Sequence, residues 1–503
     1  MQLNQTSYSQ IDKKFVRNFW VILLFLFIVR IIAIYIIPLN DSTEARYGEI
    51  ARIMLETHNW ITPMQEYGIP FWAKPPLSFW MSALSMKLFG VNEFAARFPS
   101  LILSLGILFL VWHTAKLRLG QKGASLSVLI LASCVLFFLD AGAIMTDPAL
   151  LFCTTLIILS FWQAVIYNNK FYSYSFFIGI GLGLLAKGPI AIVLTGLPIF
   201  LWALIHNKWR NIWGNLPWFR GVIITLLIAL PWYILAEIKT PGFLNYFILG
   251  EHFGRFLNSG WVGDKYGFAH NTPLGFIWLY MSIGFMPWTI LAVIWSIKYR
   301  KKLPNLLYDD NGWISYLFLC STMPLVFFTF ARNIIYPYVL PVLPSMALLF
   351  AELIVKADVN SPSKLRIIPL SCLSGLIFII ASILFIYKPA VVEQSQKRVV
   401  QIYNENASSN SKLIYWSPKV DFSASFYSKG KALATAKENE LYALLDNHEH
   451  NLLVVESKYF KTIPEYISSK MHRLAIIENE NKSFEIYLFC TIHHNQPLCG
   501  RPR

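Results

Sequence analysis

Apolar stretches recur along the first 387 residues and are separated by polar segments. An α-helix rises about 1.5 Å per residue, so about 20 apolar residues cross the hydrocarbon core of a bilayer. Eleven stretches approach this length, and the fifth, which is short, meets the sixth at residues 187–189. They lie near residues 19–37, 101–117, 124–139, 149–166, 174–186, 190–205, 222–238, 273–297, 313–330, 334–355 and 367–387. The pattern predicts a polytopic α-helical membrane protein with about 11–13 transmembrane helices.

Two of the intervening segments are long, residues 38–99 and 239–272. In the first, apolar residues between Tyr47 and Met54 repeat with helical spacing opposite a polar stripe, which predicts an amphipathic helix at the membrane surface. A second helical pattern runs from Leu77 to Leu88. Long ordered loops on one face of a bundle are where binding and catalytic residues concentrate.

The last segment, residues 388–503, is polar and differs from the membrane domain expected over residues 1–387. Short strand patterns occur near residues 412–416, 452–456 and 483–489. We therefore predict a small C-terminal α/β domain.

Composition and charge refine this prediction. Hydrophobic residues make up 55% of the chain and charged residues 14%, which excludes a soluble globular protein and a disordered chain. The formal net charge is +15. The segments predicted to lie on the same side of the membrane as the N-terminus hold 17 basic and 4 acidic residues, whereas the loops on the opposite side hold 10 basic and 11 acidic residues. Cytoplasmic loops carry the excess of Lys and Arg, so we expect a cytoplasmic N-terminus and an exported C-terminal domain. This topology accounts for the basic charge without a nucleic acid partner.

The first long loop contains candidate charged groups at two helix starts. Asp41 and Glu44 stand where the amphipathic helix begins, so they either cap it and complement its dipole or present a carboxylate at the mouth of a membrane cavity. Lys74 precedes two prolines at the start of the next helix. A cation there adds to the positive end of the helix dipole and favours an anion site, although a lysine can also extend to lipid headgroups.

Further candidates follow on the same face. Asp147 precedes Pro148 between two spans, where it can cap the next helix and also border an outer cavity. In the second long loop, Arg255 suits a phosphate through its bidentate guanidinium, and Glu251 could pair with it at i, i+4. His252 is a second phosphate donor, a base or a surface imidazole.

Arg332 and Tyr338 lie at the outer edge between two spans, where tyrosines commonly mark the membrane interface. In the polar tail, Cys490 and Cys499 are separated by eight residues. Because an exported tail meets an oxidising compartment, we predict a disulfide between them in preference to free thiols or a metal site.

Eight motifs in register give the chain a family resemblance. They are Thr43-Glu44-Ala45-Arg46-Tyr47, Trp60-Ile61-Thr62-Pro63, Lys74-Pro75-Pro76-Leu77, Val91-Asn92-Glu93-Phe94-Ala95-Ala96-Arg97-Phe98-Pro99, Met145-Thr146-Asp147-Pro148, Lys187-Gly188-Pro189, Glu251-His252-Phe253 and Tyr338-Val339-Leu340-Pro341. Over about residues 15–355 the chain resembles the bacterial aminoarabinose transferases of lipid A. These belong with the protein O-mannosyltransferases among multispanning glycosyltransferases that use lipid-linked sugars.

The resemblance implies a multi-pass enzyme of the bacterial inner membrane, here with a periplasmic C-terminal domain. It also implies an undecaprenyl-phosphate-linked sugar donor and an acceptor that is commonly lipid A. Lys74 and Arg255, with Tyr338 and His252 nearby, would hold the donor phosphate. Asp147 and a first-loop acid would bind or activate the acceptor.

Arg46, Tyr47 and Arg332 would have supporting roles at this site. The family usually has Asp where Thr43 stands, so the first-loop acid is either Asp41 or Glu44. It commonly has Glu where Ala73 precedes Lys74, so we expect no required metal or other cofactor. We also expect a monomer.

The motifs do not distinguish aminoarabinose from a related amino sugar or hexose. Two alternative functions stay open. One is a transferase of the same fold that acts on an exported protein or another glycan. The other, a polyprenyl-lipid transporter, would need ionisable residues deep in its spans, where few occur in this sequence.

Overall fold

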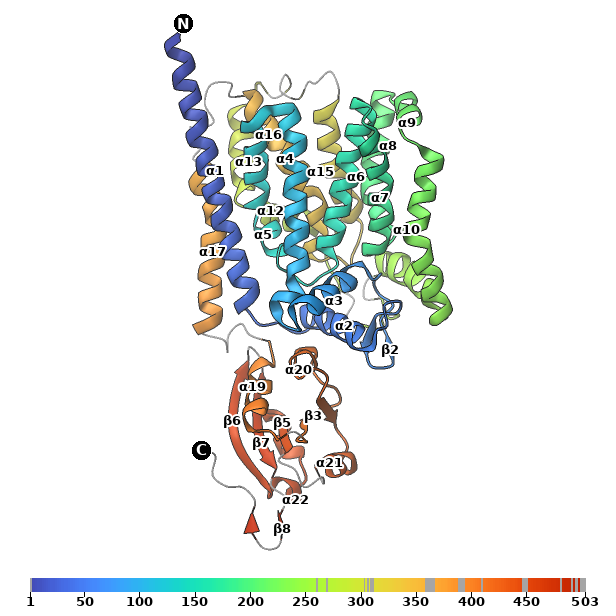
Figure 1. The fold of residues 1–503 in the computed structure, drawn as a ribbon, viewed down its shortest axis with the longest axis vertical. Helices are drawn as coiled ribbons and strands as arrows, with labels where there is room; N and C mark the ends of the chain where they lie inside the picture. The colour runs from blue at the N-terminus through green and yellow to red at the C-terminus, as the bar shows by residue number, and fades with distance from the viewer. Residues whose placement is uncertain are drawn as a thin grey trace.

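The computed structural model describes residues 2–258, 261–267, 270–302, 304, 307, 312–357, 367–387, 394–408, 410–445, 451–479, 482–489, 492–493 and 496–497. A bundle of long helices forms one part of the molecule, and a smaller unit with a β-sheet lies beyond one end of it (Figure 1). The start of the first helix lies at the opposite end of the bundle from the sheet (Figure 1). The two parts correspond to the predicted membrane domain and C-terminal domain.

Helices cover all eleven predicted apolar stretches. They are α1 (Gln2–Ile36), α4 (Glu93–Ala132), α5 (Val135–Asp140), α6 (Asp147–Tyr167), α7 (Lys170–Lys187), α8 (Ile190–His206), α10 (Trp218–Lys239), α12 (Phe276–Gly284), α13 (Trp288–Lys298), α15 (Trp313–Thr329), the 3₁₀-helix η2 (Tyr336–Val342), α16 (Leu343–Ala357) and α17 (Ile367–Tyr387). A short helix, α9 (Trp209–Asn215), joins α8 to α10.

Within the described residues, five helical segments are long and apolar enough to cross a membrane on their own. They are Arg17–Ile36, Glu93–Ala132, Asp147–Tyr167, Trp218–Lys239 and Tyr336–Ala357. The pair α12 and α13, bent by 97°, makes a sixth. The polytopic helical fold is confirmed, and the chain is a multi-span membrane protein, although several predicted spans are shorter or more bent than one continuous helix.

Local sequence explains where one of the bundle helices, α4, begins and where it bends. The Asn92 side chain accepts a hydrogen bond from the Ala95 N–H and caps α4. Gly120 interrupts the same helix at φ +67, a backbone conformation that glycine adopts at little cost. This break separates the two predicted stretches 101–117 and 124–139.

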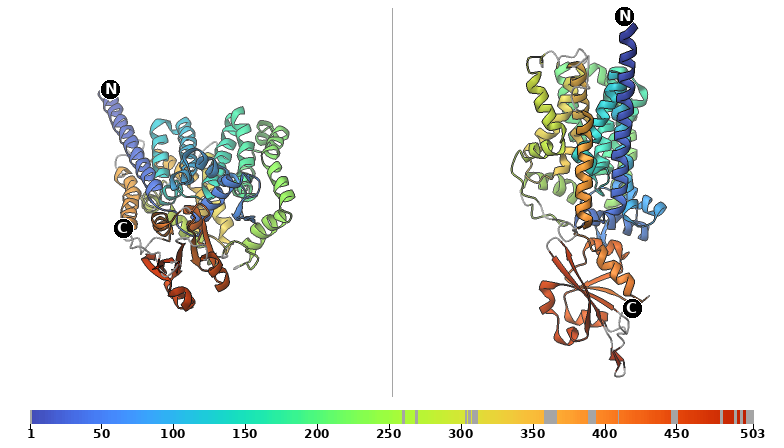
Figure 2. Two further views of the ribbon diagram at one scale, coloured as in Figure 1. Left: turned by 60° about the horizontal axis from the view of Figure 1, so that its bottom comes forward. Right: turned by 90° about the vertical axis from the view of Figure 1, so that its left-hand side faces the viewer.

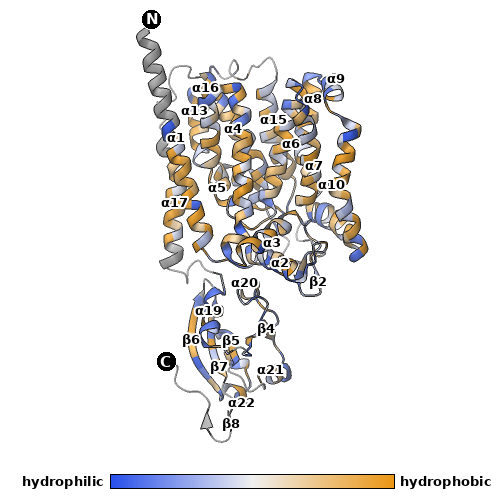
Figure 3. Ribbon diagram, in the orientation of Figure 1, coloured by the Kyte–Doolittle hydropathy of each residue, from blue (hydrophilic) through white to orange (hydrophobic). Residues whose placement is uncertain are grey.

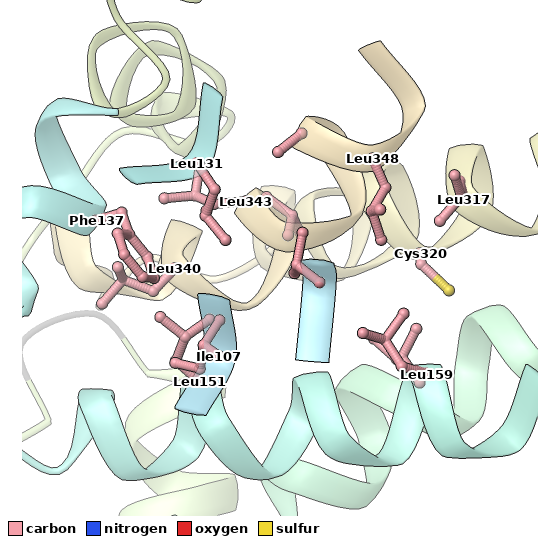
Figure 4. Packing of buried hydrophobic residues seen from close by; sticks show 14 of the residues in the cluster. Ile107, Leu131, Phe137, Leu151, Leu159, Leu317, Cys320, Leu340, Leu343 and Leu348 are labelled. Atoms are coloured by element: carbon pink, nitrogen blue, oxygen red, sulfur yellow. The ribbon is translucent and has the colours of Figure 1, made fainter. Parts of the chain in front are cut away.

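A continuous apolar core holds the bundle together. Figure 4 shows part of it, where side chains of α4, α6, α15 and α16 such as Leu131, Leu159, Leu317 and Leu348 meet. The helices of the bundle consist largely of hydrophobic residues (Figure 3), and many of these residues are exposed. On α10, for example, Phe219 is 81% exposed and Leu227 is 69% exposed. Lipid contact accounts for such a surface.

The first long loop folds into α2 (Thr43–Thr57), a short hairpin of β1 (Met64–Glu66) and β2 (Ile69–Pro70), and α3 (Leu77–Phe89). Figure 1 shows these helices lying across the end of the bundle, as predicted for amphipathic outer-face helices. The second long loop contains a π-helix, η1 (Asn245–Gly254), followed by α11 (Arg255–Leu257).

The C-terminal domain is built on a five-stranded sheet with the order β4-β3-β5-β7-β6 (Figure 2). Its strands are β3 (Leu413–Trp416), β4 (Ala432–Thr435), β5 (Asn451–Glu456), β6 (Met471–Asn479) and β7 (Lys482–Phe489). The first three are parallel to one another, and β7 pairs antiparallel with both β5 and β6. The three strand patterns predicted from the sequence coincide with β3, β5 and β7.

Helices pack on both faces of this sheet. One apolar cluster includes α19 (Lys397–Asn406) and α20 (Phe422–Tyr427), and a second includes α21 (Glu438–Leu445) and α22 (Glu465–Ser468). The 3₁₀-helix η4 (Ser457–Thr462) joins β5 to α22, and a small hairpin pairs β8 (Ile492–His493) with β9 (Gln496–Pro497). The predicted α/β character of the domain is confirmed.

The C-terminal domain docks on the first loop through α20. Phe426 is 1% exposed and belongs to the apolar cluster of α2 and α3. Tyr427 Oη donates to Glu93 Oε1 at 3.0 Å and accepts a hydrogen bond from the Leu39 N–H at 2.7 Å. Lys397 Nζ lies 2.5 Å from the same Glu93 carboxylate. The contact is therefore an apolar centre bordered by polar bonds.

Candidate active site

A cavity opens where both long loops meet the end of the bundle. Lys74 stands just before α3, Lys187 ends α7, Arg255 begins α11 and Tyr338 lies in η2, so the loops and the bundle each contribute to it. Its lining consists of Ala73, Lys74, Leu150, Lys187, Ile190, Leu194, Phe247, Glu251, His252, Arg255, Phe256, Phe328, Ala331, Asn333, Tyr338 and Pro341. Cationic groups thus face one part of the cavity, and aliphatic and aromatic side chains of the bundle face another.

Glu251 joins the two cations that were predicted to hold phosphate. Its carboxylate, 3% exposed, lies 2.9 Å from Lys74 Nζ and 3.1 Å from Arg255 Nη1. Burial opposes its ionisation, but the charges of Lys74 and Arg255 outweigh burial and lower the pKa of Glu251 below its usual value. Glu251 is therefore ionised at neutral pH and fixes both cations. The predicted i, i+4 pairing of Glu251 with Arg255 is confirmed.

Arg255 has a second acidic neighbour. Its Nη2 lies 3.4 Å from Asp264 Oδ2 in the loop that follows α11. Burial opposes its charge, but Glu251, Tyr338 and Asp264 together raise the pKa of Arg255 above its usual value. The guanidinium is charged and held between two carboxylates at the edge of the cavity.

Asp147 does not line the cavity, but it pairs with Lys187, which does. Lys187 Nζ donates to Asp147 Oδ1 at 2.5 Å, and the side chains are 11% and 5% exposed. The ammonium also lies 4.7 Å from the centre of the Tyr338 ring, within cation–π range. Asp147 is the first residue of α6 and Pro148 occupies its first turn, so the predicted position at a helix start is correct. The predicted cap is wrong, because Thr146 stands at the N-cap and α6 has no side-chain cap hydrogen bond.

His252 is held as a neutral ring. Its Nδ1 donates to the Phe247 carbonyl at 2.8 Å. Burial, reinforced by the charge of Lys74, lowers the pKa of His252 below its ordinary value. Among the roles predicted for this residue, binding of phosphate by a cationic imidazole at neutral pH is therefore disfavoured.

The two first-loop acids lie outside the lining of the cavity. Glu44 accepts two hydrogen bonds from Arg97, at 2.8 and 2.7 Å, and Arg97 is 4% exposed. Asp41 accepts hydrogen bonds from the backbone and the hydroxyl of Ser423 in α20. The structure thus pairs Asp147 with a cation of the cavity lining but does not bring Asp41 or Glu44 there, and the catalytic role of these two acids stays a prediction.

The predicted supporting residues occupy three different surroundings. Arg46 donates to the Tyr266 carbonyl and lies 5.6 Å from the centre of the Phe71 ring. Tyr47 is 6% exposed and packs in the apolar cluster of the first loop. Arg332 is exposed, and its carbonyl accepts a hydrogen bond from the Thr272 N–H at 2.7 Å.

Sequence reasoning missed three polar members of the site as functional residues: Lys187, Asn333 and Asp264. Lys187 belongs to a motif of the resemblance, which was the signal available for it. Asn333 and Asp264 lie in irregular segments, and their spacing from the cations along the chain is unrelated to their distance in space. Among the described residues, no group of three or more His, Cys, Asp and Glu side chains could hold a metal ion. Cys490 and Cys499 lie outside the described residues.

Comparison with known proteins adds independent information. Residues 73–235 match the family model described as dolichyl-phosphate-mannose-protein mannosyltransferase. The undecaprenyl phosphate-alpha-4-amino-4-deoxy-L-arabinose arabinosyl transferase of Edwardsiella ictaluri is 27% identical over 344 residues, which cover 66% of this chain and 59% of that protein. The protein of the same name from Enterobacter sp. is 28% identical over 331 residues, 63% of this chain and 57% of that one. The chain matches about three fifths of the length of these relatives.

A solved structure decides the fold. The crystal structure of ArnT from Cupriavidus metallidurans bound to undecaprenyl phosphate superposes with a TM-score of 0.71 at 17% identity, and covers 93% of this chain and 98% of that one. The chain has the ArnT fold. The apo structure of the same protein gives a TM-score of 0.69 at 18% identity, with coverage of 93% and 97%. The resemblance predicted from the eight motifs is confirmed, and it extends through the C-terminal domain.

Proposed function

We propose that this chain is a membrane glycosyltransferase. It moves a single sugar, aminoarabinose or a related amino sugar or hexose, from undecaprenyl phosphate to lipid A at the periplasmic face of the bacterial inner membrane. One observation carries the proposal: Lys74 and Arg255 converge on Glu251 in a cavity that is also lined by apolar side chains of the membrane bundle, among them Leu150, Ile190, Leu194 and Phe328. A lipid phosphate needs this combination of cationic donors and an apolar wall.

The orientation in the membrane follows from the proposal. The first long loop, which contributes Lys74 to the cavity, and the C-terminal domain lie at one end of the bundle, and the start of α1 lies at the other (Figure 1). A donor presented in the outer leaflet requires the cavity to face the periplasm, which places the N-terminus in the cytoplasm. The distribution of basic residues supports the same orientation.

The reaction is an inverting displacement at the anomeric carbon of the sugar. The acceptor oxygen forms a bond to this carbon while the bond to the phosphate oxygen breaks, and undecaprenyl phosphate leaves. Lys74 and Arg255 stabilise the charge that grows on the departing phosphate, because charged donors fixed in a cavity act strongly on developing charge. Glu251 keeps both donors in position before the substrate binds.

The acceptor decides what Asp147 must do. A lipid A phosphate is already anionic and needs little deprotonation. A hydroxyl acceptor must lose a proton, and we assign this step to Asp147, whose carboxylate pairs with the lining residue Lys187. Lys187 would then hold the carboxylate in its reactive orientation.

Mass spectrometry of lipid A tests the proposal. Cells that express the chain should carry lipid A with one added sugar, whose mass identifies it, and cells that express Lys74→Ala should not. Transfer to an exported protein or another glycan with lipid A unchanged would support the alternative acceptor. Movement of the polyprenyl lipid across the membrane without any sugar transfer would support a transporter and contradict the proposal.

A further inference from the structure

Asn333 is a buried polar residue in the wall of the cavity. It is 5% exposed and lies in the short segment that precedes η2. Its Nδ2 has no hydrogen-bond partner among the described residues. An unpaired buried donor costs folding free energy, so one that belongs to a residue lining a cavity points to a ligand atom that pairs with it.

A hydrogen bond to the side-chain oxygen of Asn333 shows which atom of its amide group is unpaired. The His270 N–H donates to Asn333 Oδ1 at 3.0 Å. Because a backbone N–H needs an acceptor, the carbonyl oxygen must occupy this position and the NH₂ group must be the unpaired one. The orientation of the Asn333 amide is therefore set by the chain and not by its ligand.

The backbone around Asn333 is held in place by the second long loop. The Thr272 N–H donates to the Arg332 carbonyl at 2.7 Å, and Thr272 Oγ1 donates to the Ile334 carbonyl at 3.0 Å. Together with the bond from His270, three hydrogen bonds fix residues 332–334. A donor positioned in this way is preorganised for binding, since little side-chain freedom remains to be lost.

We infer that Asn333 binds the substrate of this site, its Nδ2 donating a hydrogen bond to an oxygen of the head group of the lipid-phosphate sugar. The inference rests on the proposed function. The other polar groups of the lining are the cations Lys74, Lys187 and Arg255, with Glu251, Tyr338 and the neutral His252. A neutral amide donor beside them suits either a phosphate oxygen or a sugar hydroxyl, both of which are hydrogen-bond acceptors.

Two substitutions of Asn333 distinguish a role in lipid binding from a role in holding the second long loop. Asn333→Asp retains an oxygen for the His270 N–H and replaces the NH₂ group with a second acceptor, whereas Asn333→Ala removes both functions. We expect Asn333→Asp to weaken lipid binding by about 10-fold or more, because it also brings a negative charge near a phosphate, and Asn333→Ala by about 3- to 10-fold. Asn406→Ala, which alters an exposed asparagine of the C-terminal domain, is the matched control.

The measurement is the affinity of the purified full chain in detergent for undecaprenyl phosphate and for the same lipid carrying aminoarabinose, together with thermal unfolding. Weaker binding of both lipids assigns Asn333 to the phosphate, and weaker binding of the sugar-bearing lipid alone assigns it to the sugar. If Asn333→Asp binds both lipids within about twofold of the wild type, the inference is overturned, whatever the stability of Asn333→Ala. If both variants lose affinity but also unfold at clearly lower temperature than the wild type, the role is structural and the inference fails.

The proposed function can fail separately. A wild-type chain that binds the lipid phosphate but transfers no sugar to lipid A would contradict the proposed function while leaving the effect of Asn333 on binding intact. A wild-type chain that binds neither lipid overturns both.

Discussion

Asp41 in the first outer loop accepts a hydrogen bond from the backbone N–H of Ser423, at 3.0 Å, although 382 positions separate the two residues in the chain. The Ser423 hydroxyl donates to the other carboxylate oxygen. Burial, followed by the charge of Asp421, raises the pKa of Asp41 to about 7, against the opposing effect of the two bonds from Ser423. The contact that joins the C-terminal domain to the membrane domain thus contains a group that titrates near neutral pH.

This contact predicts a pH-dependent stability. The folded pKa of Asp41 lies above its ordinary value of 3.8, so its stabilising contribution is complete below about pH 4 and is lost as the pH rises to about 7. Asn at this position cannot ionise. We expect Asp41→Asn to be more stable than the wild type at pH 8, by on the order of 1–3 kcal/mol, and to match it near pH 4. Thermal unfolding of both chains in detergent across this range measures the difference, and parallel pH profiles would refute the prediction.

Removal of either cation that we propose to hold the donor phosphate should abolish most of the activity. We expect Lys74→Ala and Arg255→Ala each to lower kcat/KM for sugar transfer by about 100-fold or more, because each removes a charged donor to the leaving phosphate. Lys87→Ala is the control, since Lys87 is exposed at the other end of α3. The assay is transfer from undecaprenyl-phosphate-linked aminoarabinose to lipid A by purified protein. Near-normal rates for both variants would exclude the cavity as the donor phosphate site.

The buried pair of Asp147 and Lys187 can be tested by a double-mutant cycle. Asp147→Asn alone leaves a buried ammonium without its counter-charge and should cost about 3 kcal/mol or more in stability. Adding Lys187→Gln removes that charge, so the double variant should recover much of the loss in thermal unfolding. If Asp147 acts on the acceptor, sugar transfer stays low in the double variant. Recovery of transfer along with stability would show that Asp147 only balances Lys187.

Gly188 leaves no room for a side chain behind the cavity. Its φ is +86, and a Cβ there would lie 2.6 Å from Phe247 Cζ and 3.2 Å from His252 Cε1. We expect Gly188→Ala to destabilise the protein by about 2–4 kcal/mol through backbone strain and overpacking, and to lower sugar transfer by displacing η1. Gly196→Ala, where a Cβ meets its nearest atom at 4.0 Å, is the matched control within α8. Equal thermal stability of the two variants would contradict this account.

Much of the fold was predictable because lipid imposes simple rules on sequence. The apolar stretches, the amphipathic helix from Tyr47 to Met54 and the strands near residues 413–416 and 451–456 are all local patterns, and the structure contains each of them. The bends were less predictable. The 97° angle between α12 and α13 lies inside one apolar run, where hydropathy does not register the change of direction.

The candidate site was predictable in part. Lys74, Arg255, Tyr338 and His252 line one cavity, as the motif order implied. The positions of the first-loop acids Asp41 and Glu44 were not predictable. A carboxylate at a helix start has the same local sequence whether it faces a cavity, Arg97 or another domain. The position of Asn333 depends on hydrogen bonds from a loop about 60 residues earlier in the chain.

The sequence by itself determined the membrane-spanning character, the positions of the apolar helices and the α/β tail, because hydrophobic burial and helix periodicity are properties of neighbouring residues. Its motifs also indicated Lys74 and Arg255, which line one cavity. Only the tertiary structure decided which charges meet. It paired Glu251 with both Lys74 and Arg255, joined Asp147 to Lys187, and turned Asp41 toward Ser423. Buried ions need counter-charges and donors within a few ångströms, and folding brings these partners from distant parts of the chain.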